Sequence, residues 1–102
     1  MKKKIHYKAL VTYLSTDESG LVAPLSSGFR CSVRFAFQNM DFIGIQNFTD
    51  TELVFPGDKA NADFSLIDAD TFIKDLYEGM DFELFTNSDK IGSGIITEVY
   101  VS

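Results

Sequence analysis

The residue types best suited to nucleophilic catalysis occur once each in this chain. Cys31 is the single cysteine and His6 the single histidine among 102 residues. A thiolate nucleophile needs a neighbouring base, and one cysteine with one histidine cannot build the usual zinc frameworks. The chain also lacks a Gly-x-x-x-x-Gly-Lys-Ser/Thr phosphate loop. We therefore expect a small buried side chain at Cys31, no enzymatic activity, no cofactor and no GTP binding.

Two carboxylate pairs, Asp17-Glu18 and Asp68-x-Asp70, are the remaining candidates for acid–base chemistry or metal binding. Calcium loops need more oxygen ligands than a lone Asp-x-Asp supplies. Aspartate commonly caps the first turn of a helix, and carboxylates are frequent in solvated turns. We expect Asp68 or Asp70 to cap a helix, Asp17 and Glu18 to lie in a loop, and no metal site.

The charges are distributed unevenly along the chain. The net charge is −6, but four of the nine basic residues are lysines within residues 1–8, so residues 9–102 carry five basic and fifteen acidic groups, or −10. An acidic body repels phosphate, and nucleic-acid binding needs clustered cations. We expect residues 1–4 to be a frayed basic end.

No apolar run suits a signal peptide or a membrane span, so we expect a cytoplasmic protein without membrane contact.

Alternation of apolar and polar residues with a period of two predicts strands along most of the chain. In the first strand, Tyr7, Ala9, Val11 and Tyr13 share one face. Further strands are expected at residues 31–38, 42–48, 60–66, 81–85 and 91–101. The core is expected to contain Phe35, Phe37, Phe64, Leu66, Phe82, Ile96 and Val99. The sequence predicts one all-β domain over residues 1–102, a six-stranded antiparallel closed β-barrel.

Two local signals refine this prediction. Pro56-Gly57 predicts a type II turn, because proline presets φ at the first central position and glycine allows positive φ at the second. Gly44 interrupts the strand at residues 42–48, where a barrel strand bends or another group approaches closely.

One segment departs from the strand pattern. Between residues 68 and 79, Phe72, Ile73, Leu76 and Tyr77 have the spacing of a helical stripe. Gly79 is suited to ending a helix in the left-handed conformation. We expect one short helix here, with Phe72 and Leu76 packed on the end of the barrel.

Seven short blocks follow one another in the order of a known family. They lie at residues 14–25, 28–30, 41–44, 55–58, 60–67, 78–82 and 91–96, and they include Phe55-Pro56-Gly57-Asp58 and Ile91-Gly92-Ser93-Gly94. Together these blocks resemble the C-terminal β-barrel domain of translation elongation factor Tu. The resemblance implies the closed barrel, here expected as a free-standing domain without the GTPase domain of that factor.

The departures from the family concern its contacts with tRNA. In the family, an Arg-His pair and an Arg-Glu-Gly turn contact the T stem of aminoacyl-tRNA. Those positions here carry Leu21-Val22 and Phe85-Thr86-Asn87. Apolar groups cannot replace a guanidinium or an imidazole at phosphate and ribose. We therefore expect the tRNA-binding surface to be lost.

The replacements define a candidate partner-binding surface of Leu21, Val22, Leu25, Phe85 and Asn87. If the family topology holds, the four apolar residues are partly exposed and suit a hydrophobic interface. The equally weighted alternative is that a shifted loop places them in the core. The implied function is that of a non-enzymatic protein-binding module whose partner is a translation component, and self-association is a further option.

Two other functions remain open at this point. The acidic body would suit an immunity or decoy protein that neutralises a basic toxin. An RNA-binding protein linked to translation would need its body cations to converge on one face. Those cations are Arg30, Arg34, Lys59, Lys74 and Lys90.

Overall fold

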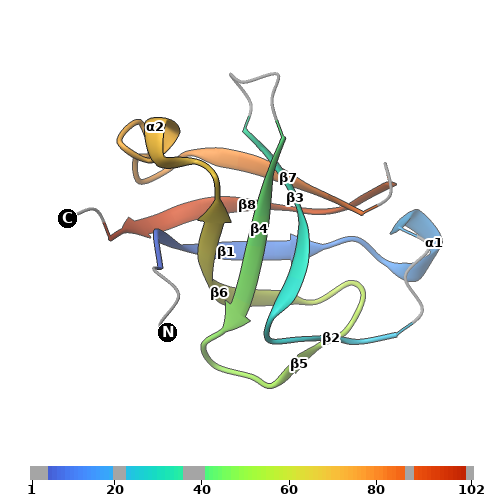
Figure 1. Ribbon diagram of the computed structural model, residues 1–102. Coiled ribbons are helices and arrows are strands. Elements are labelled where there is room, and N and C mark those ends of the chain that lie inside the picture. Colours follow the sequence, from blue (N-terminus) through green and yellow to red (C-terminus); the bar gives the residue numbers. More distant parts are fainter. Residues whose placement is uncertain (1–4, 20–22, 36–40, 87–88, 101–102) are drawn as a thin grey trace.

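The computed structural model describes residues 5–19, 23–35, 41–86 and 89–100. Six strands form a closed antiparallel barrel with the neighbour order β1-β6-β4-β3-β7-β8 (Figure 1). The strands are β1 Tyr7–Tyr13, β2 Leu25–Ser26, β3 Phe29–Phe35, β4 Asp41–Phe48, β5 Leu53–Val54, β6 Lys59–Ile67, β7 Asp81–Thr86 and β8 Asp89–Val99. The predicted all-β barrel is confirmed.

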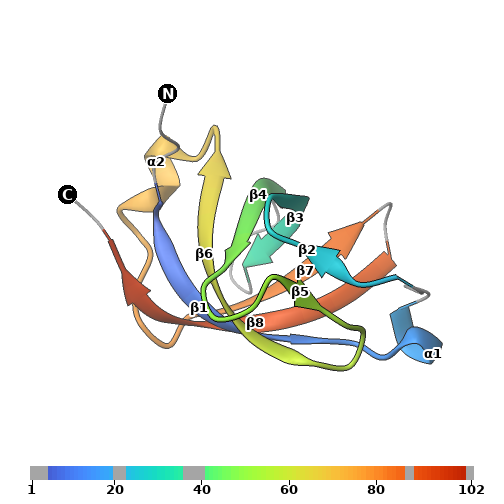
Figure 2. The same ribbon diagram turned by 90° about the horizontal axis from the view of Figure 1, so that it is seen from below.

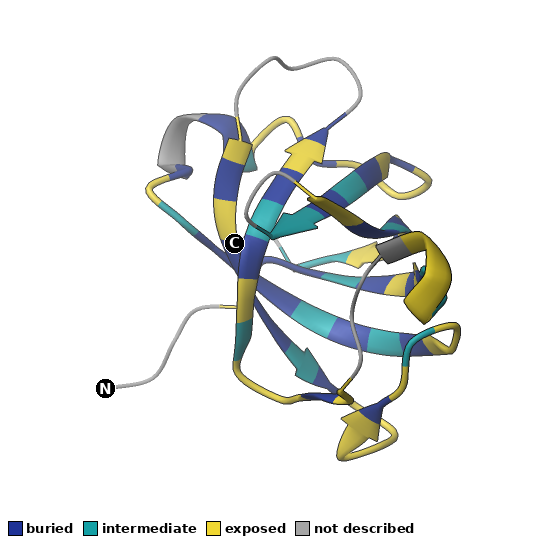
Figure 3. Ribbon diagram, turned by 90° about the vertical axis from the view of Figure 1, so that its right-hand side faces the viewer, coloured by how far each residue is buried: buried dark blue, intermediate teal, exposed yellow. Residues whose placement is uncertain are grey.

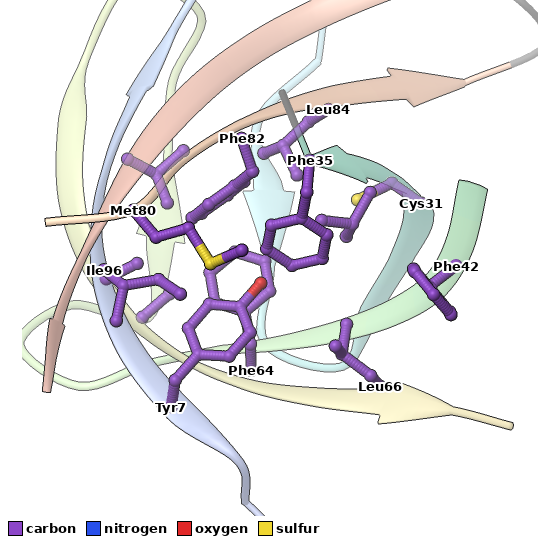
Figure 4. Close-up of a cluster of buried hydrophobic side chains, with 14 of the residues drawn as sticks. Tyr7, Cys31, Phe35, Phe42, Phe64, Leu66, Met80, Phe82, Leu84 and Ile96 are labelled. Atoms are coloured by element: carbon purple, nitrogen blue, oxygen red, sulfur yellow. The ribbon is translucent and has the colours of Figure 1, made fainter. Parts of the chain in front are cut away.

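The interior of the barrel is built from alternate residues of each strand. Buried and more exposed residues alternate along β1 and β3, as one-sided burial requires, whereas β4 and β6 each contain three consecutive buried residues (Figure 3). Aromatic rings fill the centre, where Tyr7 stacks on Phe64 with centroids 4.9 Å apart and Phe82 meets Phe64 edge-on at 5.2 Å (Figure 4). Such pairs add to the stabilisation from apolar burial.

Most of the expected core is buried in the structure. The buried members are Phe35, Phe64, Leu66, Phe82 and Ile96. Val99 is only half-buried, because it lies at the last position of β8, and packs against the edge of the core. Phe37 lies outside the described residues.

The turn at Pro56-Gly57 has the expected geometry. Gly57 has φ +92°, and the Asp58 N–H donates to the carbonyl of Phe55 at 3.0 Å. The Gly57 N–H also donates to the Leu14 carbonyl at 3.1 Å, so the turn is fastened to the end of β1. This confirms the predicted type II turn.

The predicted helix between residues 68 and 79 is present but short. It is α2, Asp70–Ile73, and Phe72 packs on the barrel end, with its ring stacked on Phe42 at 4.9 Å. Ala69 occupies the N-cap position without a side-chain hydrogen bond. The predicted aspartate cap is therefore wrong, because Ala69, between the two aspartates, takes the N-cap position and Asp68 precedes it with φ +57°.

The end of α2 also differs from the prediction. The helix stops at Ile73, and Gly79, with φ +90°, lies instead in the turn in which the Met80 N–H donates to the Tyr77 carbonyl at 3.2 Å. The glycine supplies positive φ as expected, but to the turn that leads into β7 rather than to the helix.

Two features have no counterpart in the sequence-based prediction. A single helical turn, α1, Thr16–Ser19, forms where a loop was expected, and it lies at the opposite end of the barrel from α2 (Figure 1, Figure 2). Outside the barrel, β2 and β5 pair with each other as a two-stranded ribbon. No local alternation signals strands of two residues.

Candidate interaction surface

The structure separates the five residues predicted to bind a partner. Leu21, Val22 and Asn87 lie outside the described residues. Leu25 is only 8% exposed and belongs to the core cluster. Of the two alternatives left open for Leu25, exposure and core placement, the core placement holds, because Leu25 pairs with the buried Val54 in the β2–β5 ribbon. Phe85, half-buried on β7, is the one described member that faces outward.

Phe85 belongs to a row of side chains across the outside of three strands. Ser32 on β3 pairs with Ile43 on β4 on one side and with Phe85 on β7 on the other. Ile43 is 51% exposed. The small serine between two large apolar side chains leaves an open hollow of about 570 Å³. We name Ile43, Ser32 and Phe85, with the adjacent Arg30, the β3 face.

The two arginines of β3 differ in their environment. Arg34 forms two hydrogen bonds with Asp41, from Nε to Oδ1 at 2.8 Å and from Nη2 to Oδ2 at 3.1 Å, which lower the pKa of the carboxyl group. The Arg34 guanidinium also lies over the Phe85 ring, 4.4 Å from its centroid. Arg30 is exposed and has no ion-pair partner among the described residues. The β3 face therefore combines apolar surface with one unneutralised cation.

The side chains of Cys31 and His6 each accept a hydrogen bond inside the fold. Cys31 is buried as expected, and burial raises the pKa of its thiol to about 12, so the thiolate is absent near neutral pH. Gln46 Nε2 donates to its sulfur at 3.1 Å. His6 Nδ1 accepts the backbone N–H of Leu66 at 2.9 Å, which occupies that nitrogen.

The buried polar side chain of Gln46 was not predicted from the sequence. Gln46 on β4 is fully buried, and its Oε1 accepts the hydroxyl of Tyr13 while its amide contacts Cys31. The strand pattern contained the signal, because Gln46 has the same parity as the inward-facing Phe42 and Phe48. Buried polar groups persist when they are hydrogen-bonded, so this cluster fits a structural role.

Within the described ranges, no three His, Cys, Asp or Glu residues are grouped so that they could hold a metal ion. Nor does any helix in that part of the chain have the length and apolar character needed to cross a bilayer.

No family model matches the sequence. The resemblance to elongation factor Tu therefore stays a prediction, with which the closed six-stranded barrel is compatible.

Proposed function

We propose that this chain is a non-enzymatic protein-binding module, a barrel like the C-terminal domain of elongation factor Tu, and that its β3 face contacts the partner. The observation that carries this proposal is the exposure of Ile43 and the half-burial of Phe85 on either side of Ser32, on the solvent side of an antiparallel sheet. The outer side of such a sheet is usually polar. Apolar anchors next to an arginine are the composition that protein interfaces favour.

The distribution of cations supports a protein partner over tRNA. Arg34 and Lys90 are paired with Asp41 and Glu83, each at 2.8 Å. Lys59 begins β6, which β4 separates from β3 in the barrel. A surface that tracks phosphates needs several unneutralised cations on one face. A translation component in the cytoplasm is the partner class that the family resemblance favours.

Site-specific photo-crosslinking tests the proposal. A benzoylphenylalanine placed at Ile43 should form a reproducible adduct with one protein in the native cytoplasm, and the same group at the exposed Glu52 should not. Phe85→Ser should reduce the adduct at position 43, since an interface anchor commonly contributes more than about 1 kcal/mol. Circular dichroism of the variant controls for loss of the fold.

A binding assay with aminoacyl-tRNA separates the two candidate ligands. No binding is expected at physiological salt. Tight binding that weakens steeply with added salt, together with equal adducts at positions 43 and 52, would overturn the proposal and favour RNA.

A further inference from the structure

A second hollow lies on the other side of β7, over the outer surface of β8. Its volume is about 390 Å³, and its walls come from β1 and β7. Ser93 forms the floor, paired with Thr12 on β1 and with Glu83 on β7. Short side chains at the centre of this row explain why the surface is depressed there. We name this depression the β8 hollow.

One border of the β8 hollow is apolar and exposed. Leu10 on β1 and Ile95 on β8 are cross-strand partners, 40% and 48% exposed. Directly opposite side chains of this kind lie within contact distance in an antiparallel pair. Together they present a continuous aliphatic strip to solvent.

The strip ends in the carboxylate of Asp81. Asp81 on β7 pairs with Ile95, so the row runs from Leu10 through Ile95 to Asp81. None of the described residues forms an ion pair with Asp81, whereas Glu83 is bound to Lys90 at 2.8 Å. The hollow thus offers an aliphatic strip that leads to one available negative charge.

We propose that the β8 hollow binds a lysine or arginine side chain presented by an extended segment of a partner protein. The aliphatic stem of such a side chain packs on Leu10 and Ile95 while its cationic head meets Asp81. The acidic body, with −10 over residues 9–102, attracts a basic segment from a distance.

The shape of the hollow favours a protein segment over a free small cation. Sites for small molecules enclose most of the ligand surface, whereas this depression is partly open to solvent. An extended segment can place one side chain in the hollow and use its backbone and neighbours on the surrounding surface. This site is separate from the β3 face and does not depend on it.

An amide-resolved NMR titration tests the proposal on the intact chain. The probe is the synthetic peptide acetyl-Ser-Lys-Val-Arg-Val-Lys-Ser-amide, and the matched peptide carries glutamine in place of each basic residue. Shifts are expected at the amides of Leu10, Asp81 and residues 93–95 with the basic peptide only. Asp81→Asn and Ile95→Ser should each weaken binding about fivefold. Asp75→Asn, which removes an equal charge elsewhere, should change it less than about twofold.

Three outcomes would overturn the proposal. Equal weakening by Asp75→Asn and Asp81→Asn would show diffuse attraction to an acidic surface. Displacement of the peptide by spermidine at equal concentration would assign the hollow to a free polyamine. The same shifts on concentrating the protein without peptide would assign it to a second copy. Because Ile95 and Asp81 are both exposed, neither variant disturbs the core, and a thermal melt of each checks this.

Discussion

The two sides of the β7–β8 pair differ in how much change they tolerate. On the inside, the Phe82 ring lies so close to Gly94 that a Cβ there would overlap it, with Cε1 only 2.8 Å away. On the outside, Asp81 and Ile95 border an open hollow. The inner side of these strands is thus closely packed, while the outer side leaves room for substitution.

The two outer surfaces differ from each other in charge. The β3 face has Arg30 beside Ile43, the β8 hollow has Asp81 beside Ile95, and neither charge has an ion-pair partner in the part of the chain that the structure describes. Both surfaces share β7, since Phe85 and Asp81 lie on its outer side. Similar apolar anchors with opposite charges fit different partner chemistry, so changes on one surface should leave binding at the other intact.

The largest expected effect concerns the inner side. Gly94→Ala should destabilise the protein by about 2 kcal/mol, because the added methyl group overpacks the Phe82 ring. Urea unfolding measures this change. The matched substitution Ser93→Ala, one residue away on the outer side, should change the free energy of unfolding by less than about 0.5 kcal/mol. Equal losses of stability from the two substitutions would contradict a difference in tolerance between the inner and outer sides of these strands.

The next effect concerns the buried polar cluster. Gln46→Leu should destabilise the protein by about 1.5 kcal/mol, because the buried Tyr13 hydroxyl loses its acceptor. Adding Tyr13→Phe should recover most of this loss, since the orphaned hydroxyl is then removed. A double-mutant cycle in urea measures the coupling. Additive losses would mean that Tyr13 and Gln46 do not depend on each other.

A smaller effect is expected at the turn between β5 and β6. Gly57→Val should destabilise by about 1 kcal/mol or more, because a β-branched residue is strained at φ +92°. Gly57→Asn should be milder, since asparagine tolerates positive φ better. Space is not the cause, because no heavy atom of the described residues lies within 4 Å of the position that a Cβ would take. Thermal unfolding of both variants measures the two losses of stability. Equal melting temperatures for the valine and asparagine variants would exclude backbone strain as the cause.

The sequence predicted the barrel because its signals were local. Alternation placed Tyr7, Val11 and Tyr13 on one face, and Pro56-Gly57 marked a turn whose geometry needs only neighbouring residues. The sequence left open whether Leu25 is exposed or buried, because its burial depends on pairing with Val54, from a distant part of the chain.

Both outer surfaces depend on strand register in the same way. Leu10 meets Ile95, and Ser32 meets Phe85, only when strands that are distant in the chain pair with each other. No local pattern indicates which outward side chains become neighbours. Phe85 was found through the family resemblance, whereas the β8 hollow had no signal in the sequence.

The smallest expected effect is the pH dependence of the Arg34–Asp41 pair. The hydrogen bond from Arg34 lowers the pKa of Asp41 in the folded protein. Because the folded pKa lies below the unfolded value of about 3.9, the stabilisation is complete above that value and is lost as the pH falls through the folded pKa. Both side chains are exposed to solvent, which screens the pair, so the gain in stability is small. An NMR titration of the Asp41 carboxyl carbon should show the lowered pKa, and Arg34→Met should return it toward its ordinary value. If the titration is the same in both proteins, the ion pair contributes nothing, and Arg34 is held over Phe85 by the ring alone.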